Sequence, residues 1–451
     1  MTATLPALPP PGELRVPQWV ERELPGGLTV IVVQRPSVPL VELRLRVPFG
    51  TAPLATAEVL TETLLSGTET MSNLEIAARL QSIGGNLAAN VDPDRLLVSG
   101  NGLVSGLDRL LEMLAQVLTG ATYPEQEVAT ERDRLADRIQ VARSQPAHLA
   151  RVALLKRMYG RHPYAVQTPE PDEVRAVGRD ALHGLHRQRL HPAGATLVLV
   201  GDIAPEAALD AVAAALAGWD GAGAPAELPL APPLSPGPLV LADRPGSVQS
   251  SLRLALPAVA RTHPDHAPLQ LANLIFGGYF SSRWVENIRE DKGYTYGPHS
   301  TVEHLVAGSA VVVAADVATE VTAPALLETL YELGRLASVP PSPDELEQAR
   351  QYALGTLQLG MSTQAGLAGL ASTYAGFGLR LDHLARHSAA MAAATVDQVA
   401  EAAATYLGPA AAVSVVLGDA ERVEPQLSRL VPVTRDTPPV PGSGALPGTS
   451  R

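Results

Sequence analysis

The chain has no cysteine and only two lysines, Lys156 and Lys292, among its 451 residues. Lack of cysteine excludes disulfides, thiolate nucleophiles and cysteine-ligated zinc or iron–sulfur sites. The net charge of −12 argues against a nucleic-acid-binding surface, because phosphate contacts require clustered cations. Since 46% of the residues are hydrophobic and only 18% are charged, almost every stretch can bury one face. We therefore expect a globular protein.

Long apolar runs and a basic leader are also lacking. No uncharged stretch made up of apolar residues approaches the ~18–20 residues that a membrane-spanning helix requires. The N-terminal sequence MTATLPALPPPGELRVPQ has neither the basic flank nor the apolar run of a signal peptide. These absences lead us to expect a cytoplasmic protein without a membrane partner.

What the sequence does contain is an internal duplication in the order of its patterns. In the first half, residues 41–47 alternate apolar with charged side chains, which predicts a half-buried strand. The segments LVLVGD (197–202) and SVVLGD (414–419) close the two halves and lie 217 residues apart. Between these landmarks, amphipathic helices and short strands follow one another in the same order. The pattern predicts an α+β protein with two homologous domains, each a mainly antiparallel sheet flanked by helices.

Composition sets the expected boundaries. A stretch rich in Gly, Ala and Pro separates the halves and is typical of a linker. The Pro- and Gly-rich C-terminus is typical of a disordered tail. The predicted segments are a flexible arm (1–15), a first domain (16–217), a linker (218–238), a second domain (239–433) and a disordered tail (434–451).

Common catalytic motifs are missing. His383 and His387 have the i, i+4 spacing of a zincin helix, but Leu384 stands where the water-activating glutamate is needed. The other histidine pairs have no convincing acidic partner. There is also no G-x-S-x-G nucleophile elbow and no P-loop.

One segment does stand out, the sequence FGGYFSSRWVENIREDKGYTY at 276–296. Here the chain resembles the insulinase/pitrilysin (M16) family of zinc metallopeptidases, in particular its two-domain, processing-peptidase-like branch. Further fragments extend the resemblance over nearly the whole chain: GGLTVIVV (26–33), Gly67-Thr68, His162-Pro163-Tyr164 and LVLVGD. The resemblance implies the fold of these metallopeptidases, which is LuxS-like.

The zinc motif of the family, His-x-x-Glu-His, is degenerate here. Glu58, Thr61 and Glu62 stand at its three positions, and Glu131 best matches the third metal ligand. Without imidazole or thiolate, affinity for zinc should be poor, and a threonine cannot act as a general base at neutral pH. We therefore expect this chain to bind no zinc and to hydrolyse no peptide alone. Whether the three carboxylates hold another ion stays open, the simpler interpretation being a solvated helix face.

The second-domain motif is intact. In active family members an arginine and a tyrosine seven residues apart grip the substrate, and the resemblance implies these roles for Arg289 and Tyr296. A guanidinium can hold a carbonyl or carboxylate, and a tyrosine hydroxyl can donate a hydrogen bond to an oxyanion. In the alternative, Arg289 pairs with Glu286 or Asp291 and Tyr296 merely packs. A nearby turn is predicted to let a peptide pass closely, through Gly277, Gly278, Ser281 and Ser282.

Loss of the zinc motif beside an intact Arg/Tyr pair suggests a division of labour. The resemblance implies a heterodimer in which a paralogue bearing His-x-x-Glu-His supplies zinc and this chain supplies Arg289 and Tyr296 in trans. Substrates would be unfolded peptides or leader segments, bound as an added β-strand. Two alternatives remain: a scaffold, like the respiratory-complex core subunits of the same fold, and a homodimer that binds peptide without cleaving it.

Overall fold

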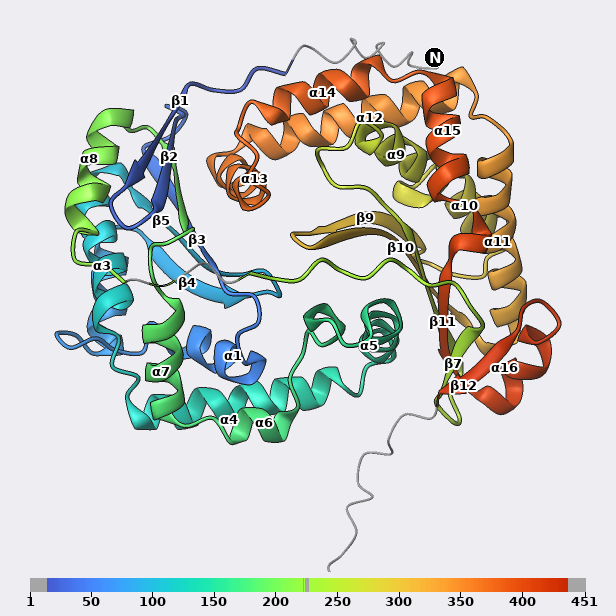
Figure 1. The fold of residues 1–451 in the computed structure, drawn as a ribbon, viewed down its shortest axis with the longest axis horizontal. Coiled ribbons are helices and arrows are strands. Elements are labelled where there is room, and N and C mark those ends of the chain that lie inside the picture. Colours follow the sequence, from blue (N-terminus) through green and yellow to red (C-terminus); the bar gives the residue numbers. More distant parts are fainter. Residues whose placement is uncertain (1–13, 222, 224–226, 437–451) are drawn as a thin grey trace, which may run out of the picture.

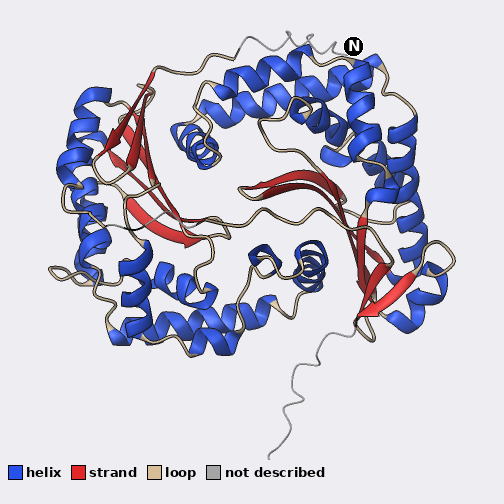
Figure 2. Ribbon diagram, in the orientation of Figure 1, coloured by secondary structure: helices blue, strands red, loops and turns tan. Residues whose placement is uncertain are grey.

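The computed structural model describes residues 14–221, 223 and 227–436, which form two similar halves (Figure 1). The two sheets lie toward the middle of the molecule, and most helices cover their outer faces (Figure 2). None of the described helices is long and apolar enough to cross a membrane.

The first half contains a six-stranded sheet with the strand order β1-β2-β6-β3-β5-β4. Its elements are β1 (Trp19–Leu24), β2 (Leu28–Gln34), β3 (Leu40–Pro48), α1 (Leu54–Thr63), α2 (Asn73–Ser82), β4 (Asn86–Val91), β5 (Arg95–Leu103), α3 (Leu107–Gly120), α4 (Glu125–Ala142), α5 (Pro146–Tyr159), α6 (Pro171–Arg175), α7 (Arg179–Arg189), β6 (Thr196–Gly201) and α8 (Pro205–Ala215).

The second half contains a sheet with the order β12-β7-β11-β8-β10-β9. Its elements are β7 (Leu239–Asp243), β8 (Gln249–Pro257), α9 (His266–Asn273), the π-helical turn η3 (Leu274–Gly278), α10 (Arg283–Val285), the π-helical turn η4 (Glu286–Asp291), β9 (His299–Leu305), β10 (Gly308–Ala318), α11 (Thr322–Ser338), α12 (Pro343–Ser362), α13 (Gln364–Gly376), α14 (His383–Ala393), α15 (Val396–Tyr406), β11 (Val413–Gly418), α16 (Ala420–Leu427) and β12 (Val433–Asp436).

The predicted duplication is confirmed by the topology. The strands that carry LVLVGD and SVVLGD, β6 and β11, occupy the third place in their sheets. Each pairs parallel with one neighbour, β2 or β7, and antiparallel with the other, β3 or β8. Both sheets are mixed, with antiparallel pairs in the majority, as predicted.

The outermost strand breaks the symmetry and corrects one boundary. In the first sheet it is β1, antiparallel to β2, whereas in the second it is β12, parallel to β7. Residues 434–436 were expected to be tail, but they belong to β12 because their backbone pairs with the otherwise free edge of β7. The remainder of the expected tail (437–451) and most of the expected N-terminal arm (1–13) lie outside the described residues.

Local signals account for the core. On β3 the apolar side chains of Leu43 and Leu45 are fully buried against the helical layer, and the charged side chains alternate with them on the opposite face. Burying each leucine stabilises the fold by roughly 1.5–3 kcal/mol. Helix α12 starts at Pro343 because Ser342 caps it, with the Glu345 carboxylate accepting a hydrogen bond from the Ser342 N–H in return.

The two halves exchange helices. Helix α5 of the first half packs on β8 and β11 of the second, and α13 of the second half packs on β3 and β6 of the first. Leu154 of α5 joins a core with Val415, and Leu367 of α13 joins a core with Val198. In Figure 1 both helices lie between the sheets. The inner face of each sheet is therefore buried by the other half, which fixes the halves relative to each other.

A hydrogen-bonded latch joins two hairpin turns across the halves. The buried Tyr164 hydroxyl donates to Oδ1 of Asp94, in the turn between β4 and β5, and accepts from the Ala307 N–H over 2.9 Å. The other Asp94 oxygen accepts from the Val306 N–H over 3.0 Å, in the turn between β9 and β10. Burial raises the pKa of Asp94. The His162-Pro163-Tyr164 fragment thus connects the halves.

Substituting Tyr164→Phe is expected to lower the free energy of unfolding by about 1–3 kcal/mol, because the buried Ala307 N–H loses its partner. Urea denaturation measures this loss. Tyr159→Phe is the matched control, since the Tyr159 ring packs on Tyr164 at 5.5 Å but its hydroxyl bonds to none of the described residues. Equal losses in both variants would contradict the latch.

Candidate functional site

The degenerate zinc positions lie on the packed helices α1 and α4. Thr61 is buried, and its hydroxyl donates to the backbone carbonyl of Glu58 over 2.8 Å. The Glu62 carboxylate pairs with Arg138 of α4 at 2.5 Å. Glu131 pairs with Arg134 on its own helix at 2.7 Å. The carboxylates of Glu62 and Glu131 are therefore each paired with an arginine.

The third carboxylate, Glu58, is neutral over part of the physiological range. Burial and, to a smaller extent, the neighbouring Glu62 charge raise its pKa to about 7, and Arg138 opposes the rise. A protonated carboxyl is a poor metal ligand, and this position has no imidazole to replace it. Within the described ranges, no group of three His, Asp or Glu side chains is placed to hold a metal ion. The residues present do not fit zinc, so no catalytic step is assigned to a metal on this chain.

Arg289 and Tyr296 do come together. The guanidinium carbon of Arg289 lies 5.0 Å from the centroid of the Tyr296 ring and 4.3 Å from that of Phe280. Tyr296 is 88% exposed, and Phe280 is 59% exposed. Stacking on two rings orients the guanidinium without consuming its N–H donors. The two residues of the pair that the resemblance predicted are thus adjacent, with Tyr296 open to solvent and Arg289 partly exposed.

Local anchoring explains this placement. Ile288 is fully buried, and its carbonyl accepts a hydrogen bond from the Tyr294 N–H over 2.8 Å, which closes η4. Gly293 has φ +65°, a conformation that favours glycine, and it turns the chain toward β9. Earlier in the same segment, the buried Trp284 stacks on Phe276 at 5.3 Å. Buried residues of the segment therefore anchor Arg289 and Tyr296 to the core.

The alternative interpretation of Arg289 receives little support. Among the described residues its ionic partner is Glu290, at 3.5 Å, and neither Glu286 nor Asp291 pairs with it. The Glu290 side chain is half exposed, so this ion pair contributes little stability. Arg289 keeps donors free for a ligand.

An open cleft of about 720 Å³ adjoins the pair. It is lined by Gln249, Arg289, Glu290, Gly293, Tyr294, Thr295, Tyr296, Gly297, Asp316 and Ala318. The residues after η4 and the ends of β8 and β10 thus form its walls. Both charge signs are present, which suits a peptide backbone with charged side chains.

The predicted peptide-contacting turn is placed differently. Gly277 is buried, and a Cβ there would lie 2.8 Å from the Trp284 ring, so this glycine makes room for packing. A Cβ on Gly278 would lie 2.9 Å from Leu274. Ser282 is 1% exposed, whereas Ser281 is exposed. Burial thus argues against peptide contact by Gly277 and Ser282.

Two residues at the site were missed by the sequence analysis, Phe280 and Asp316. Phe280 is part of the quoted motif, but in sequence a lone phenylalanine looks like a core residue. Asp316 ends a long apolar strand and reaches the cleft only because β10 pairs with β8. Sequence spacing holds no signal for that neighbourhood.

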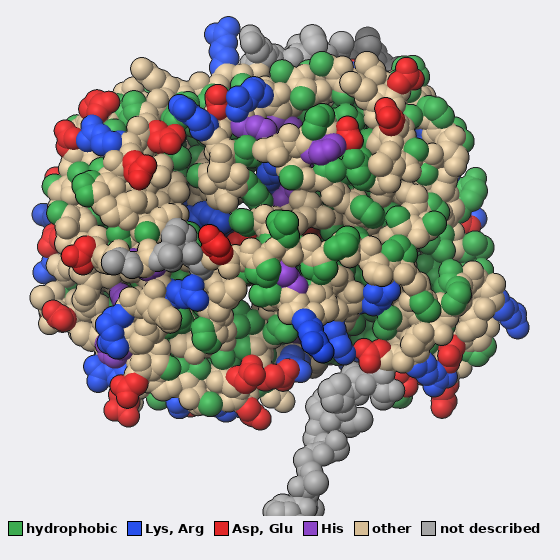
Figure 3. Space-filling view, viewed as in Figure 1, with side chains coloured by type: hydrophobic (Ala, Val, Ile, Leu, Met, Phe, Trp, Pro, Cys, Tyr) green, Lys and Arg blue, Asp and Glu red, His purple; other side chains and the backbone are tan. Residues whose placement is uncertain are grey.

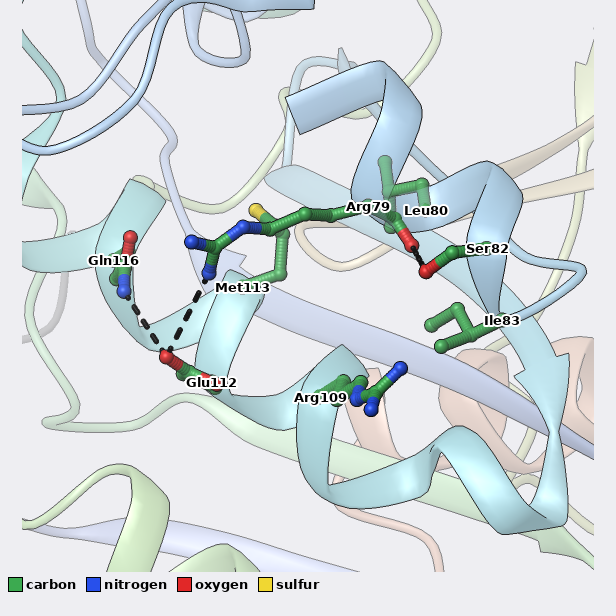
Figure 4. A pocket seen from close by; sticks show the side chains of 8 residues that line it. All are labelled: Arg79, Leu80, Ser82, Ile83, Arg109, Glu112, Met113 and Gln116. Carbon is green, nitrogen blue, oxygen red and sulfur yellow. Dashed lines mark hydrogen bonds and ion pairs between the residues drawn. The ribbon is translucent and has the colours of Figure 1, made fainter. Parts of the chain in front are cut away.

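A second pocket, of about 240 Å³, lies between α2 and α3 in the first half (Figure 4). Several of its polar groups contact one another: Glu112 accepts from Gln116 over 3.4 Å and faces Arg79 at 4.0 Å. On the face shown in Figure 3, basic and acidic side chains are interspersed. The pocket offers no combination of groups for catalysis.

Comparison with known proteins places these features in a family. The model of the insulinase family, Peptidase family M16, matches residues 55–172, which include the degenerate zinc positions on α1 and α4. The model described as the Peptidase M16 inactive domain matches residues 176–352, which include Arg289 and Tyr296.

Curated relatives and solved structures agree. Proteins named as uncharacterized zinc proteases from Streptomyces coelicolor and Mycobacterium leprae are each 24% identical over 290 and 294 residues. These matches cover 61% and 62% of this chain, and they span 63% and 65% of the relatives' own length.

The fold is likewise similar to that of a peptidase M16 inactive domain from Pseudomonas fluorescens, with a TM-score of 0.82, 23% identity and coverage of 89% of this chain and 98% of that one. A protease from Helicobacter pylori gives a TM-score of 0.81 with 18% identity, covering 89% of this chain and all of that one. Both models describe domains of the same family, and they match consecutive segments that together make up more than half of the chain. The protein therefore belongs to the M16 (insulinase) peptidase family.

Proposed function

We propose that this chain is the non-zinc subunit of a heterodimeric M16 metallopeptidase and donates Arg289 and Tyr296 in trans. A partner of the same family, bearing His-x-x-Glu-His, would supply zinc and the general base. The observation that carries the proposal is a contrast between the two halves. The catalytic positions on α1 are closed by an ion pair and burial, whereas Arg289 and Tyr296 stack on each other at an open cleft, with Tyr296 exposed and Arg289 partly exposed.

The chemistry of the pair suits peptide hydrolysis at a neighbouring metal centre. Arg289 has free N–H donors that can hold a backbone carbonyl of the substrate. The Tyr296 hydroxyl bonds to none of the described residues, so it can donate to the oxyanion that develops at the scissile carbonyl. Both groups act by hydrogen bonding and need no metal on this chain.

Free sheet edges suit an unfolded substrate. In the described structure β4 and β9 are edge strands with one unpaired side each. Strand β9 starts at His299, shortly after Tyr296. A peptide added to such an edge satisfies its backbone hydrogen bonds whatever its sequence. This supports short peptides or leader segments as substrates.

Co-purification with an M16 paralogue that carries His-x-x-Glu-His, starting with one encoded by a neighbouring gene, tests the proposal. We expect cleavage of unfolded peptides by the mixture alone, inhibition by a chelator, and zinc only on the paralogue. The two chains should elute as one complex in size-exclusion chromatography.

Chelator-sensitive cleavage by this chain alone would overturn the proposal. A complex that binds peptide but never cleaves it would instead favour the scaffold function. A homodimer with no affinity for the paralogue would favour the peptide-binding homodimer.

A further inference from the structure

The duplicated halves contain the same buried arginine arrangement on equivalent strands. In the first half, Arg44 of β3 donates from one guanidinium nitrogen to the Leu43 carbonyl over 2.7 Å and to the Gly100 carbonyl over 3.2 Å. Its other nitrogen donates to the Glu42 carboxylate over 2.9 Å. Glu42 is only 7% exposed. This ion pair lies inside the fold.

Arg253 of β8 repeats the arrangement in the second half. One nitrogen donates to the Leu252 carbonyl over 2.8 Å and to the Ala315 carbonyl over 3.2 Å. As in the first half, the second carbonyl belongs to the residue paired with the arginine's predecessor across the sheet. The other nitrogen donates to Oδ1 of Asp316 over 3.0 Å. Arg253 itself is 7% exposed.

The position of the carboxylate is what differs. Glu42 lies two residues before Arg44 on the same strand, and the position two before Arg253 is Ser251. The carboxylate has instead moved to the facing strand, at Asp316, which is paired with Ser251. The Asp316 side chain is 48% exposed. The pair of Glu42 with Arg44 shows that a buried carboxylate can satisfy the arginine of this arrangement. The fold therefore does not require the exposed carboxylate of Asp316.

Asp316 faces the same cleft as Arg289 and Tyr296. Its Oδ1 is held by Arg253, whereas its second oxygen accepts a hydrogen bond from none of the described residues. The other acid of the cleft, Glu290, is already in contact with Arg289. Asp316 is therefore a positioned carboxylate with one oxygen available to a ligand.

We propose that Asp316 forms a subsite that binds a cationic group of the peptide, either a lysine or arginine side chain or an N-terminal ammonium. The inference rests on the proposed function only in taking the ligand of this cleft to be a peptide. Arg289 and Asp316 then present opposite charges to one bound peptide, and this sets the direction in which the peptide lies. The arrangement favours a basic peptide residue next to the residue whose carbonyl Arg289 holds. Arg253 is a positioning residue.

Binding of three fluorescent decapeptides to the full chain tests this subsite. Two are N-acetylated and differ only in a central lysine or norleucine, and the third has norleucine and a free N-terminus. Fluorescence anisotropy at low ionic strength should show about three- to five-fold tighter binding of a cationic peptide, the scale of a half-exposed ion pair. The preference should shrink as salt is added.

Asp316→Asn keeps an acceptor for Arg253 and should abolish the preference. Glu42→Gln, the same change in the first-half arrangement, should preserve it. A preference for acetylated lysine peptide identifies the side chain as the ligand, and a preference for the free N-terminus identifies the ammonium. Either supports the proposal.

Absence of a preference in the wild-type chain, an unchanged preference in Asp316→Asn, or failure of all three peptides to bind would overturn it. The proposed function is tested separately by cleavage. Arg289→Ala should weaken the binding of all three peptides but leave the ratio of their affinities unchanged. Because binding and cleavage are measured separately, a heterodimer that cleaves no peptide would not contradict the subsite assignment.

Discussion

Replacing Tyr296 by phenylalanine is expected to lower kcat/KM of the reconstituted heterodimer by about 10²–10³, the usual loss when one oxyanion donor is removed. The substitution deletes only the hydroxyl. The ring that stacks 5.0 Å from the Arg289 guanidinium remains, so neither the fold nor the cleft should change. Steady-state cleavage of an unfolded peptide measures the loss, which should fall mainly on kcat because the donor acts in the transition state.

The control lies in the same half. Tyr331 of α11 is 57% exposed and lies outside the cleft lining, so Tyr331→Phe should cleave at the wild-type rate. Size-exclusion chromatography should show intact complexes for both variants. Wild-type kcat/KM in Tyr296→Phe would mean that this exposed tyrosine has a structural role only, and the trans-donation proposal would fail.

Sequence patterns predicted the duplication because each strand carries its own signal. Alternation on β3 places Leu43 and Leu45 on one face and the charged residues on the other, as predicted, but the strand is not half-buried: Glu42 and Arg46 are only 7% and 8% exposed, because α13 covers the second face. The start of α12 depends on equally local chemistry, because the capping box joins Ser342 to Glu345 three residues away. The boundary at 434 was wrong because β12 is short and polar, and its pairing with β7 depends on a distant edge.

The exchange of α5 and α13 between the halves could not be predicted. A pattern of apolar residues shows which face of a helix is buried but not which sheet it meets. Along α5 the buried residues Ala150, Leu154, Leu155, Met158 and Tyr159 do share one face, but nothing in their spacing shows that this face meets the sheet of the other half. The partner of this helix is set by the assembled cores of both halves.

At the site, the sequence and its family resemblance showed that Thr61 and Glu62 stand at positions of the zinc motif. They did not show what these side chains contact. That Arg138 neutralises Glu62 depends on the packing of α1 on α4. The exposure of Asp316 likewise depends on pairing across β8 and β10. These contacts join residues distant in sequence, so only the folded chain reveals them.

A buried histidine cluster governs the second large expected effect. His266 and His304 face each other with Nε2 atoms 3.2 Å apart, and His387 stacks on His266 at 4.5 Å. His383 stacks on His387, and Arg261 adds a positive charge to all four rings. The zincin-like spacing of His383 and His387 thus belongs to a packed cluster. Charging any one ring here places cation beside cation.

The cluster makes stability depend on pH with a definite sign. Burial, reinforced by neighbouring positive charge, lowers the pKa of His266 to about 2, of His304 to about 3 and of His387 to about 4. Unfolding returns each to its ordinary value near 6.5. Between these values the unfolded chain binds more protons, so stability falls as pH falls below about 6.5.

The size of the effect follows from the same linkage. Each histidine contributes about 1.4 kcal/mol per pH unit within its window. Glu58 acts in the opposite direction, because its pKa is raised to about 7 and the folded chain holds its proton more tightly between that pH and its ordinary value. Taken alone, His266, His304 and His387 against Glu58 leave a net loss of about 3 kcal/mol per pH unit below about pH 6.5, and burial lowers the pKa of His383 in the same direction.

Denaturant unfolding from about pH 7 down to about pH 5 should therefore show a steep loss of stability. His387→Gln removes one titrating group and should reduce the slope by about one proton. The variant should still fold, because a glutamine amide can donate to the Gln270 oxygen that His387 contacts at 2.7 Å. His299→Gln, at an exposed position, should leave the slope unchanged. A flat stability profile, or a wild-type slope in His387→Gln, would contradict the mechanism.

As the pH falls, the first region to lose its packing should be α13, the helix of the second half that packs on the first sheet. Tyr374, in α13, lies under the Arg261 guanidinium at 5.3 Å and beside His383 at 5.5 Å. Phe377, just after α13, contacts Arg261 and His304. Because α13 covers the inner face of the first sheet, protons taken up by the cluster should weaken that contact before the sheets open. Hydrogen exchange should then show earlier loss of protection in α13 and β6 than in β8.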